Sequence, residues 1–178
     1  SLDEDDWLLS VQMTTGSDEV ILCTRNGMAI RFDEKDVRAM GRTARGVTGV
    51  NLLKGDRVVG MVATHADSQL LTITENGYGK RTIVSAYRKI HRGGKGVKDI
   101  QTTERNGKVV CVMEVRESDE IMLITQKGIA IRFGVTDVRL ISRNTQGVRI
   151  IRLGEDDHVV AATFIRETAN GTPAEIIS

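Results

Sequence analysis

Cysteine and histidine are scarce in this sequence, and their scarcity limits the chemistry that it can perform. The 178 residues include two cysteines, Cys23 and Cys111, and three histidines, His65, His91 and His158. Both cysteines stand in apolar runs, where a reduced thiol packs as a small hydrophobic group. There is no CxxC pair, no Cys/His cluster and no carboxylate–His spacing typical of a zinc site or a triad. We therefore expect no metal site, no catalytic triad and no cofactor.

Aromatic residues and long apolar runs are missing as well. The chain has only six aromatic residues: Trp7, Phe32, Tyr78, Tyr87, Phe133 and Phe164. Proteins that bind single-stranded nucleic acid stack bases on aromatic side chains, so this class is disfavoured. No apolar run approaches the roughly 18 residues of a membrane-spanning helix, and no secretory leader pattern is present. We expect an intracellular, cytoplasmic protein.

The net charge of the chain is close to zero, so it gives little information about binding partners. The formal charge is +1, from 25 Lys and Arg against 24 Asp and Glu. The distribution is uneven, however, because residues 1–6 hold four acidic residues and residues 80–98 hold seven Lys and Arg. Segregation of this kind under a neutral total indicates a local basic surface.

The sequence does contain a repeat of about 50 residues. Segments that begin at Glu19, Gln69 and Glu120 align without gaps. The columns identical in all three copies are Thr24/Thr74/Thr125, Gly27/Gly77/Gly128, Arg31/Arg81/Arg132, Arg38/Arg88/Arg139, Arg42/Arg92/Arg143, Gly46/Gly96/Gly147 and Val47/Val97/Val148. Three arginines per copy in one register indicate an array of similar structural units.

Each repeat has the pattern of a group of β-strands. The motif Thr-x-[Asn/Lys]-Gly between two β-branched runs is typical of a hairpin, a third strand is expected at the Gly-Val pair, and a Val-Val strand closes the copy. A single proline and 18 glycines fit tight turns. We predict an all-β fold of about three four-stranded, propeller-type blades. The expected boundaries are 19–68, 69–119 and 120–166 for the blades, 1–18 for an acidic start with an orphan strand of a preceding blade, and 167–178 for a flexible tail. The chain is thus expected to be part of a larger array.

Basic residues at repeated positions are the predicted functional surface. A residue fixed within a repeat lies at the same height and radius in every blade, so these columns should trace a curved basic stripe. Guanidinium groups bind phosphates through paired hydrogen bonds, and a curved stripe suits a duplex that bends along it. The predicted contacts to duplex DNA are Arg31, Arg38, Arg42, Arg45, Lys80, Arg81, Arg88, Lys89, Arg92, Lys95, Arg132, Arg139 and Arg143.

Some of these arginines have a structural alternative. Arg31 and its copies follow apolar strand residues, so an ion pair or a backbone-carbonyl contact between blades is an equal alternative there, with Asp36 and Asp137 as candidate partners. Arg42 and its copies stand in loops rich in Gly, Thr and Asn, which favours exposure and DNA contact.

Two other kinds of function are weighed against DNA binding. A Walker loop requires Gly-x4-Gly-Lys-[Ser/Thr] before a helix, whereas Gly41-x4-Gly46 here precedes Val47 and a strand. Neither Tyr78 nor Tyr87 has the acidic cluster that a DNA-cleaving tyrosine needs, so both are expected to pack. A protein-interaction scaffold stays open as the alternative, and it predicts weak dependence of binding on salt.

The repeats resemble a known family. The segments "GMAIRF…DVRAMGRTARGVTGVNLL", "NGYGKRT…RGGKGVKDI" and "GIAIRF…SRNTQGVRIIRL" are similar to the C-terminal domain of bacterial DNA gyrase A, from about Trp7 to Phe164. The related protein of topoisomerase IV is the weaker match. The resemblance implies a β-pinwheel whose blades exchange strands, with duplex DNA wrapped around a basic rim to support negative supercoiling.

The resemblance also implies partners and one limitation. The partners are double-stranded DNA, the rest of gyrase A and, through it, gyrase B, with the catalytic tyrosine and the ATP site outside this chain and a location near the nucleoid. Family members carry a Gln-Arg-Arg-Gly-Gly-Lys-Gly box that is needed for wrapping. Here only Arg92 to Gly96 match it, and Ile90 and His91 replace its first two residues. We expect the chain to bind DNA but not to wrap it alone.

Overall fold

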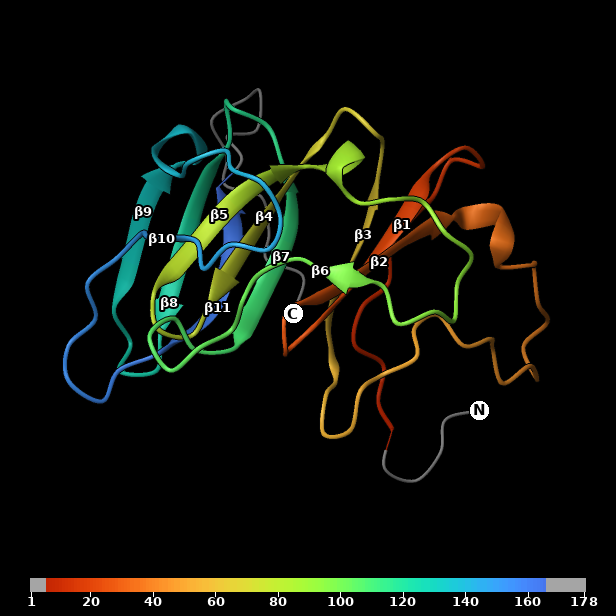
Figure 1. The fold of residues 1–178 in the computed structure, drawn as a ribbon, viewed down its shortest axis with the longest axis horizontal. Coiled ribbons are helices and arrows are strands. Elements are labelled where there is room, and N and C mark those ends of the chain that lie inside the picture. The colour runs from red at the N-terminus through yellow and green to blue at the C-terminus, as the bar shows by residue number, and fades with distance from the viewer. Residues whose placement is uncertain (1–5, 166–178) are drawn as a thin grey trace.

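The computed structural model describes residues 6–165, in which strands and short turns make up all the regular structure (Figure 1). The predicted all-β fold is confirmed. Residues 1–5 of the expected acidic start (1–18) and the whole expected tail (167–178) lie outside the described residues. The elements in chain order are β1 (Glu19–Thr24), β2 (Met28–Asp33), η1 (Glu34–Asp36), β3 (Val58–Thr64), β4 (Gln69–Thr74), β5 (Tyr78–Ile83), η2 (Val84–Ala86), β6 (Val97–Lys98), β7 (Val109–Val115), β8 (Glu120–Thr125), β9 (Ala130–Gly134), η3 (Val135–Asp137), β10 (Val148–Arg149) and β11 (Val159–Ile165).

The predicted Thr-x-[Asn/Lys]-Gly turns close the hairpins β1–β2, β4–β5 and β8–β9. In the first of them the amide of Gly27 donates to the backbone oxygen of Thr24 at 3.0 Å, and Gly27 has φ +78°. The hydroxyl of Thr24 also accepts from the amide of Met28 at 3.2 Å. A left-handed conformation at the last turn residue selects glycine, which explains why this column is invariant in the three copies.

The repeats are joined by exchanged strands. The first sheet has the order β3-β1-β2-β6 and the second has the order β10-β5-β4-β7, so each takes its outer strand from the following repeat. Met28 pairs with Lys98, and Tyr78 pairs with Arg149. The third sheet, β11-β8-β9, has three strands within the described residues. The three sheets stand side by side in Figure 1, with the outer strands β6 and β10 toward the viewer.

The core lies between neighbouring sheets. Leu71 and Ile73 from β4 meet Ile121 and Leu123 from β8, and all four are fully buried. A second cluster joins the first and second sheets through Ile21 and its neighbours. Each such side chain contributes roughly 1.5–3 kcal/mol of hydrophobic stabilisation. The blades therefore stabilise one another through their faces.

Two predicted strands are absent at the start of the chain. Residues 6–18 form no strand; instead the side chain of Gln12 donates to the backbone oxygen of Met61 at 2.8 Å and accepts from the amide of Ala63 at 2.6 Å along β3. The segment after Gly46 also forms no strand, because the described residues contain no earlier hairpin with which it could pair. None of the helical turns in residues 6–165 is long and apolar enough to cross a membrane.

Candidate nucleic-acid interface

The first arginine column connects each blade to the next repeat. Arg31 is 7% exposed, and its Nε donates to Glu19 Oε2 at 2.6 Å within the same sheet. Its Nη1 donates to the backbone oxygens of Val84 and Tyr87, at 3.1 and 2.8 Å. Val84 begins the η2 turn of the second repeat, and Tyr87 directly follows that turn. Arg31 is therefore a structural link between two blades.

The other two arginines of this column also contact the first residue of their own repeat, but they are buried to different extents. Arg81 is 6% exposed, and it donates to the backbone oxygen of Val138 at 2.6 Å and to Gln69 Oε1 at 2.9 Å. Arg132 pairs with Glu120 and is half exposed. The partner in each copy is thus the first residue of the repeat, not the aspartates that the sequence suggested.

Arg92 contacts the preceding repeat through its guanidinium group. Its Nε donates to the backbone oxygen of Asp36 at 2.9 Å, and its Nη1 donates to the backbone oxygen of Thr48 at 2.9 Å. Both acceptors are neutral, so the positive charge of Arg92 is not compensated. The side chain is half-buried, not freely projecting as the sequence suggested.

Arg143 repeats this geometry one blade further along. Its Nε donates to the backbone oxygen of Ala86 at 2.8 Å and its Nη1 to the backbone oxygen of Lys98 at 2.9 Å. Arg42, in the first repeat, is exposed and makes no such contact within residues 6–165. The column therefore holds two anchored cations and one free cation.

The glycine-rich loop that contains Arg92 packs tightly on its neighbours. The amide of Gly93 donates to the backbone oxygen of Gly49 at 2.6 Å, so it is not free to bind a phosphate. Gly96 has φ +75°, and a Cβ atom there would lie 2.3 Å from the backbone oxygen of Ala29. Glycine at position 96 is thus required by the close approach of β6 to β2, whereas Gly46 of the same column has open space around it.

Lys89 is compensated by acids of the first blade. Its Nζ lies 2.8 Å from Asp33 Oδ2 and 3.3 Å from Glu19 Oε1. The hydrogen bond to Asp33, followed by that to Glu19, raises the pKa of Lys89, and the same bond lowers the pKa of Asp33. Although Lys89 is exposed, two carboxylates neutralise it, which makes it a weak candidate for DNA contact.

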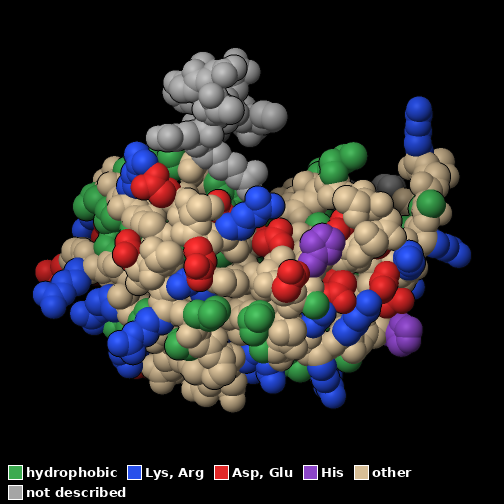
Figure 2. Space-filling view, turned by 90° about the horizontal axis from the view of Figure 1, so that it is seen from above, with side chains coloured by type: hydrophobic (Ala, Val, Ile, Leu, Met, Phe, Trp, Pro, Cys, Tyr) green, Lys and Arg blue, Asp and Glu red, His purple; other side chains and the backbone are tan. Residues whose placement is uncertain are grey.

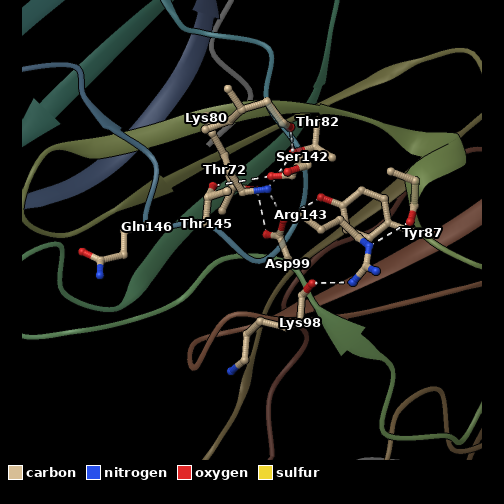
Figure 3. A network of polar contacts seen from close by, with 12 residues as sticks. Thr72, Lys80, Thr82, Tyr87, Lys98, Asp99, Ser142, Arg143, Thr145 and Gln146 are labelled. Carbon is tan, nitrogen blue, oxygen red and sulfur yellow. Dashed lines mark hydrogen bonds and ion pairs between the residues drawn. The ribbon is translucent and has the colours of Figure 1, made fainter.

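Lys80 is completely buried, so its assignment as a DNA contact is corrected (Figure 3). Its Nζ donates to Asp99 Oδ1 at 2.9 Å and to the hydroxyl of Thr82 at 2.6 Å. Asp99 also accepts from the hydroxyls of Tyr87, at 2.5 Å, and Thr72, at 2.8 Å. Burial, together with the charge of Asp99, raises the pKa of Tyr87 far above its usual value. These five residues form a closed polar network, which we call the buried network.

The buried network occurs only in the middle repeat. Its columns hold Leu22, Ile30, Phe32, Val37 and Gly49 in the first repeat and Leu123, Ile131, Phe133, Val138 and Ile150 in the third. The middle blade thus has an ionic cluster where the others have apolar residues. Asp99 anchors it at the exchanged strand, since its amide donates to Gly27 of the first blade at 2.9 Å and its backbone oxygen accepts from Asn144 of the third repeat at 2.8 Å.

Eight predicted DNA contacts keep an uncompensated positive charge. They are exposed or half-buried, and none forms an ion pair with any residue between 6 and 165. We call them the loop cations: Arg38, Arg42, Arg45, Arg88, Arg92, Lys95, Arg139 and Arg143. All lie in the connections that follow the short helical turns. In Figure 2, Lys and Arg side chains gather along the lower margin and at both ends, with acidic side chains mainly between them.

Metal chemistry finds no support in the described part of the chain. Between residues 6 and 165, no three His, Cys, Asp or Glu side chains gather closely enough to hold a metal ion. Within this range, the side chain of His91 forms an ion pair or hydrogen bond with Asp36 alone, at 3.3 Å, and it is almost fully exposed.

Blades that share strands, with arginines clamping each connection to its neighbour, define a propeller-like β-repeat protein of the pinwheel type. The family model described as "DNA gyrase C-terminal domain, beta-propeller" matches residues 18–65, 68–115 and 119–166. The chain therefore belongs to the DNA gyrase C-terminal domain family.

Curated relatives and solved structures agree with this family. The DNA gyrase A protein of Staphylococcus aureus strain MRSA252 is 45% identical over 96% of this chain, and that of strain NCTC 8325 is 46% identical over 95%. The chain spans 19% of the length of each. The crystal structure of a topoisomerase IV C-terminal domain has a TM-score of 0.86 at 29% identity, covering 93% of this chain and 52% of that one. A DNA gyrase A C-terminal domain has a TM-score of 0.84 at 29% identity, covering 92% and 56%.

Proposed function

We propose that this chain is a non-catalytic element of a type II topoisomerase, of the gyrase A type, that binds and bends duplex DNA. The observation that carries the proposal is the set of eight loop cations, which lack carboxylate partners within the described residues. In the proposed assembly, the rest of gyrase A holds the cleaving tyrosine, and gyrase B supplies ATP hydrolysis.

The energetics favour a duplex as the partner. Neutralising eight phosphates would give log Kd a slope of roughly 7 against log salt, which corresponds to a loss of affinity on the order of 10⁴ between 50 and 200 mM salt. Bending a few tens of base pairs costs roughly 1–6 kcal/mol. A few ionic contacts added by the bend offset that cost. Recognition through phosphates alone is indifferent to sequence.

The test is a salt-titrated anisotropy measurement with labelled linear duplexes of unrelated sequence. The variant Arg42→Glu/Arg45→Glu/Lys95→Glu reverses three exposed loop cations whose side chains form no ion pair or hydrogen bond within residues 6–165. We expect it to abolish binding while its circular dichroism spectrum is unchanged. The matched control, Lys54→Glu/Arg57→Glu/Arg116→Glu, reverses three exposed charges outside the connections that hold the loop cations and should retain most of the affinity.

Two results would overturn the proposal. Equal affinities of the loop variant and the parent would remove the loop cations from the interface. Binding to the parent that is insensitive to salt would favour a protein-interaction scaffold. Bending is measured separately by energy transfer between dyes at the duplex ends, and wrapping by topoisomer shifts on relaxed circles. We expect bending without a topoisomer shift, since only the Arg92–Gly96 part of the wrapping box is present.

A further inference from the structure

An open pocket of about 460 Å³ lies between the second and third repeats, outside the loop cations. Its lining includes Tyr78 at the start of β5, Arg149 on β10 and Arg105 in the turn before β7. Arg152 lines the same pocket. Three arginines thus meet at the end of the molecule that carries the β4–β5 hairpin turn.

Tyr78 organises two of these arginines. Its hydroxyl oxygen lies 3.3 Å from Arg105 Nε, 3.2 Å from Arg149 Nε and 2.8 Å from Arg149 Nη2. The two guanidinium carbons also lie 5.0 and 5.3 Å from the centre of its ring. The ring is almost completely buried, whereas both arginines are exposed at their outer sides. A rigid neutral anchor therefore orients two cations toward one opening.

The positive charge of this pocket is only partly offset within the described residues, because its lining holds Arg105, Arg149 and Arg152 against one carboxylate, Asp157. Neither Arg105, Arg149 nor Arg152 forms an ion pair with a carboxylate between residues 6 and 165. Holding two like charges against one phenol is unfavourable unless an anion joins them, and ordering two long side chains also costs entropy. Hydrogen bonds from Arg105 and then Arg149 lower the pKa of Tyr78, which reflects the positive potential at this point.

The pocket is particular to the middle blade. In the first and third repeats, Met28 and Ile129 occupy the Tyr78 column, and the pairing of Val58, Val109 and Val159 places Lys54 and Glu155 at the position of Arg105. A purely structural turn would not need these substitutions, because the other two blades form the same hairpin without them.

We propose that this pocket, anchored by Tyr78, binds a backbone phosphate of the duplex that the loop cations hold. The proposal rests on the proposed function. Arg143 and Arg149 are six residues apart, which is at most about 20 Å of extended chain and less than one duplex turn of about 34 Å. Asn106 fastens the chain between them by donating to the backbone oxygen of Gln146 at 3.0 Å. A guanidinium pair suits the oxygens of a phosphate.

The test compares two changes to the pocket in the anisotropy assay. Arg105→Gln/Arg149→Gln removes both charges and should weaken duplex binding about 10-fold, with a salt slope smaller by about one for the lost phosphate contact. Tyr78→Phe keeps both charges but removes their common acceptor. It should weaken binding less and leave the salt slope unchanged. The control Arg57→Gln/Arg116→Gln removes two exposed charges elsewhere and should change affinity by less than about 2-fold.

A direct readout comes from the ¹³Cζ signal of Tyr78 in labelled protein. Saturation with duplex should shift this signal and raise the pKa of its phenol, because a bound phosphate draws the guanidinium groups away. Tyr87, which is buried elsewhere, serves as the internal control.

The outcomes separate this pocket from the proposed function. If the pocket variant binds duplex like the parent while the loop variant fails, the pocket assignment is overturned and the proposed function stands. A Tyr78 shift with inorganic phosphate or with polyglutamate, but not with duplex, also overturns it. If the parent itself does not bind duplex, both proposals fall.

Discussion

The buried network allows the sharpest test of what holds the blades in register. Asp99→Asn removes the negative charge beside Lys80, whose side chain is fully buried. At 2.9 Å the Coulomb attraction of the pair is about 6 kcal/mol with an effective dielectric of about 20, and desolvation opposes much of it. Removing one partner of such a pair leaves an uncompensated buried charge and costs about 3–5 kcal/mol. We expect that loss in the free energy of unfolding, measured by urea titration with circular dichroism.

A second variant determines whether the lower free energy of unfolding comes from the broken ion pair or from any change of residue type in the buried network. The residues of the third repeat are introduced together: Thr72→Leu, Lys80→Ile, Thr82→Phe, Tyr87→Val and Asp99→Ile. Well-packed apolar replacement of a buried ionic cluster is neutral or stabilising, so this variant should be at least as stable as the parent. The matched single control is Asp67→Asn, an exposed turn residue, with an expected change within about 0.5 kcal/mol.

Two results would refute this reasoning. A loss below about 1 kcal/mol for Asp99→Asn would mean that the network carries little of the junction's stability. If the variant with five substitutions is as unstable as Asp99→Asn, the five polar residues are needed together for stability. If Asp99→Asn shows no cooperative transition, recovery of that transition in the fivefold variant would support the argument.

Three further predictions follow from the junctions between blades. Arg31→Met should lower the free energy of unfolding by about 3–5 kcal/mol, because Glu19 and two carbonyl oxygens of the second repeat lose their donor. Arg132 is half exposed, so Arg132→Met should lower the free energy of unfolding by about 1 kcal/mol or less in the same urea titration. Gly96→Ala should cost about 2 kcal/mol or more by thermal unfolding, whereas Gly55→Ala, at φ +74° with open space around it, reports the backbone strain alone. Desolvation raises the pKa of the half-buried Cys111 to about 11, so at pH 8 about one thiol in a thousand is ionised. Its reaction with a disulfide reagent should therefore be at least about 100-fold slower than in urea, and a fast native reaction would contradict the raised pKa.

The hairpins were predictable from the sequence because their determinants are local. The motif Thr-x-[Asn/Lys]-Gly can be recognised in the sequence, and its glycine adopts positive φ in the structure. Three copies of the motif in register removed the ambiguity between strand and helix. The partner of each short outer strand was not visible in this way. A two-residue strand such as β6 has no periodicity, so nothing in Val97 and Lys98 indicates which blade they join. Strand exchange came only from the family resemblance.

The candidate site was predicted unevenly for related reasons. The exposure of the loop cations other than Arg92 and Arg143 was predictable, because Gly-rich loops lie at the surface. Arg92 and Arg143 were placed in the right loops, but their acceptors are backbone oxygens, which carry no sequence identity. Lys80 was misplaced because a lysine in a strand normally faces water. The informative comparison was between columns, since Lys80, Asp99 and Tyr78 each stand where the other repeats have an apolar residue or glycine.

The anchored arginines explain how one residue can stabilise the fold and still attract an anion. A carboxylate partner would fix the side chain and cancel its charge, as Asp33 and Glu19 do for Lys89. A carbonyl oxygen fixes the side chain equally well but leaves the charge in place, and this is the arrangement at Arg92 and Arg143. The hydroxyl of Tyr78 is likewise a neutral acceptor, and it accepts hydrogen bonds from Arg105 and Arg149. An ordered cation loses less side-chain entropy on binding than a free one. Neutral acceptors at successive junctions therefore give positive charges that are already ordered before the proposed phosphate backbone binds.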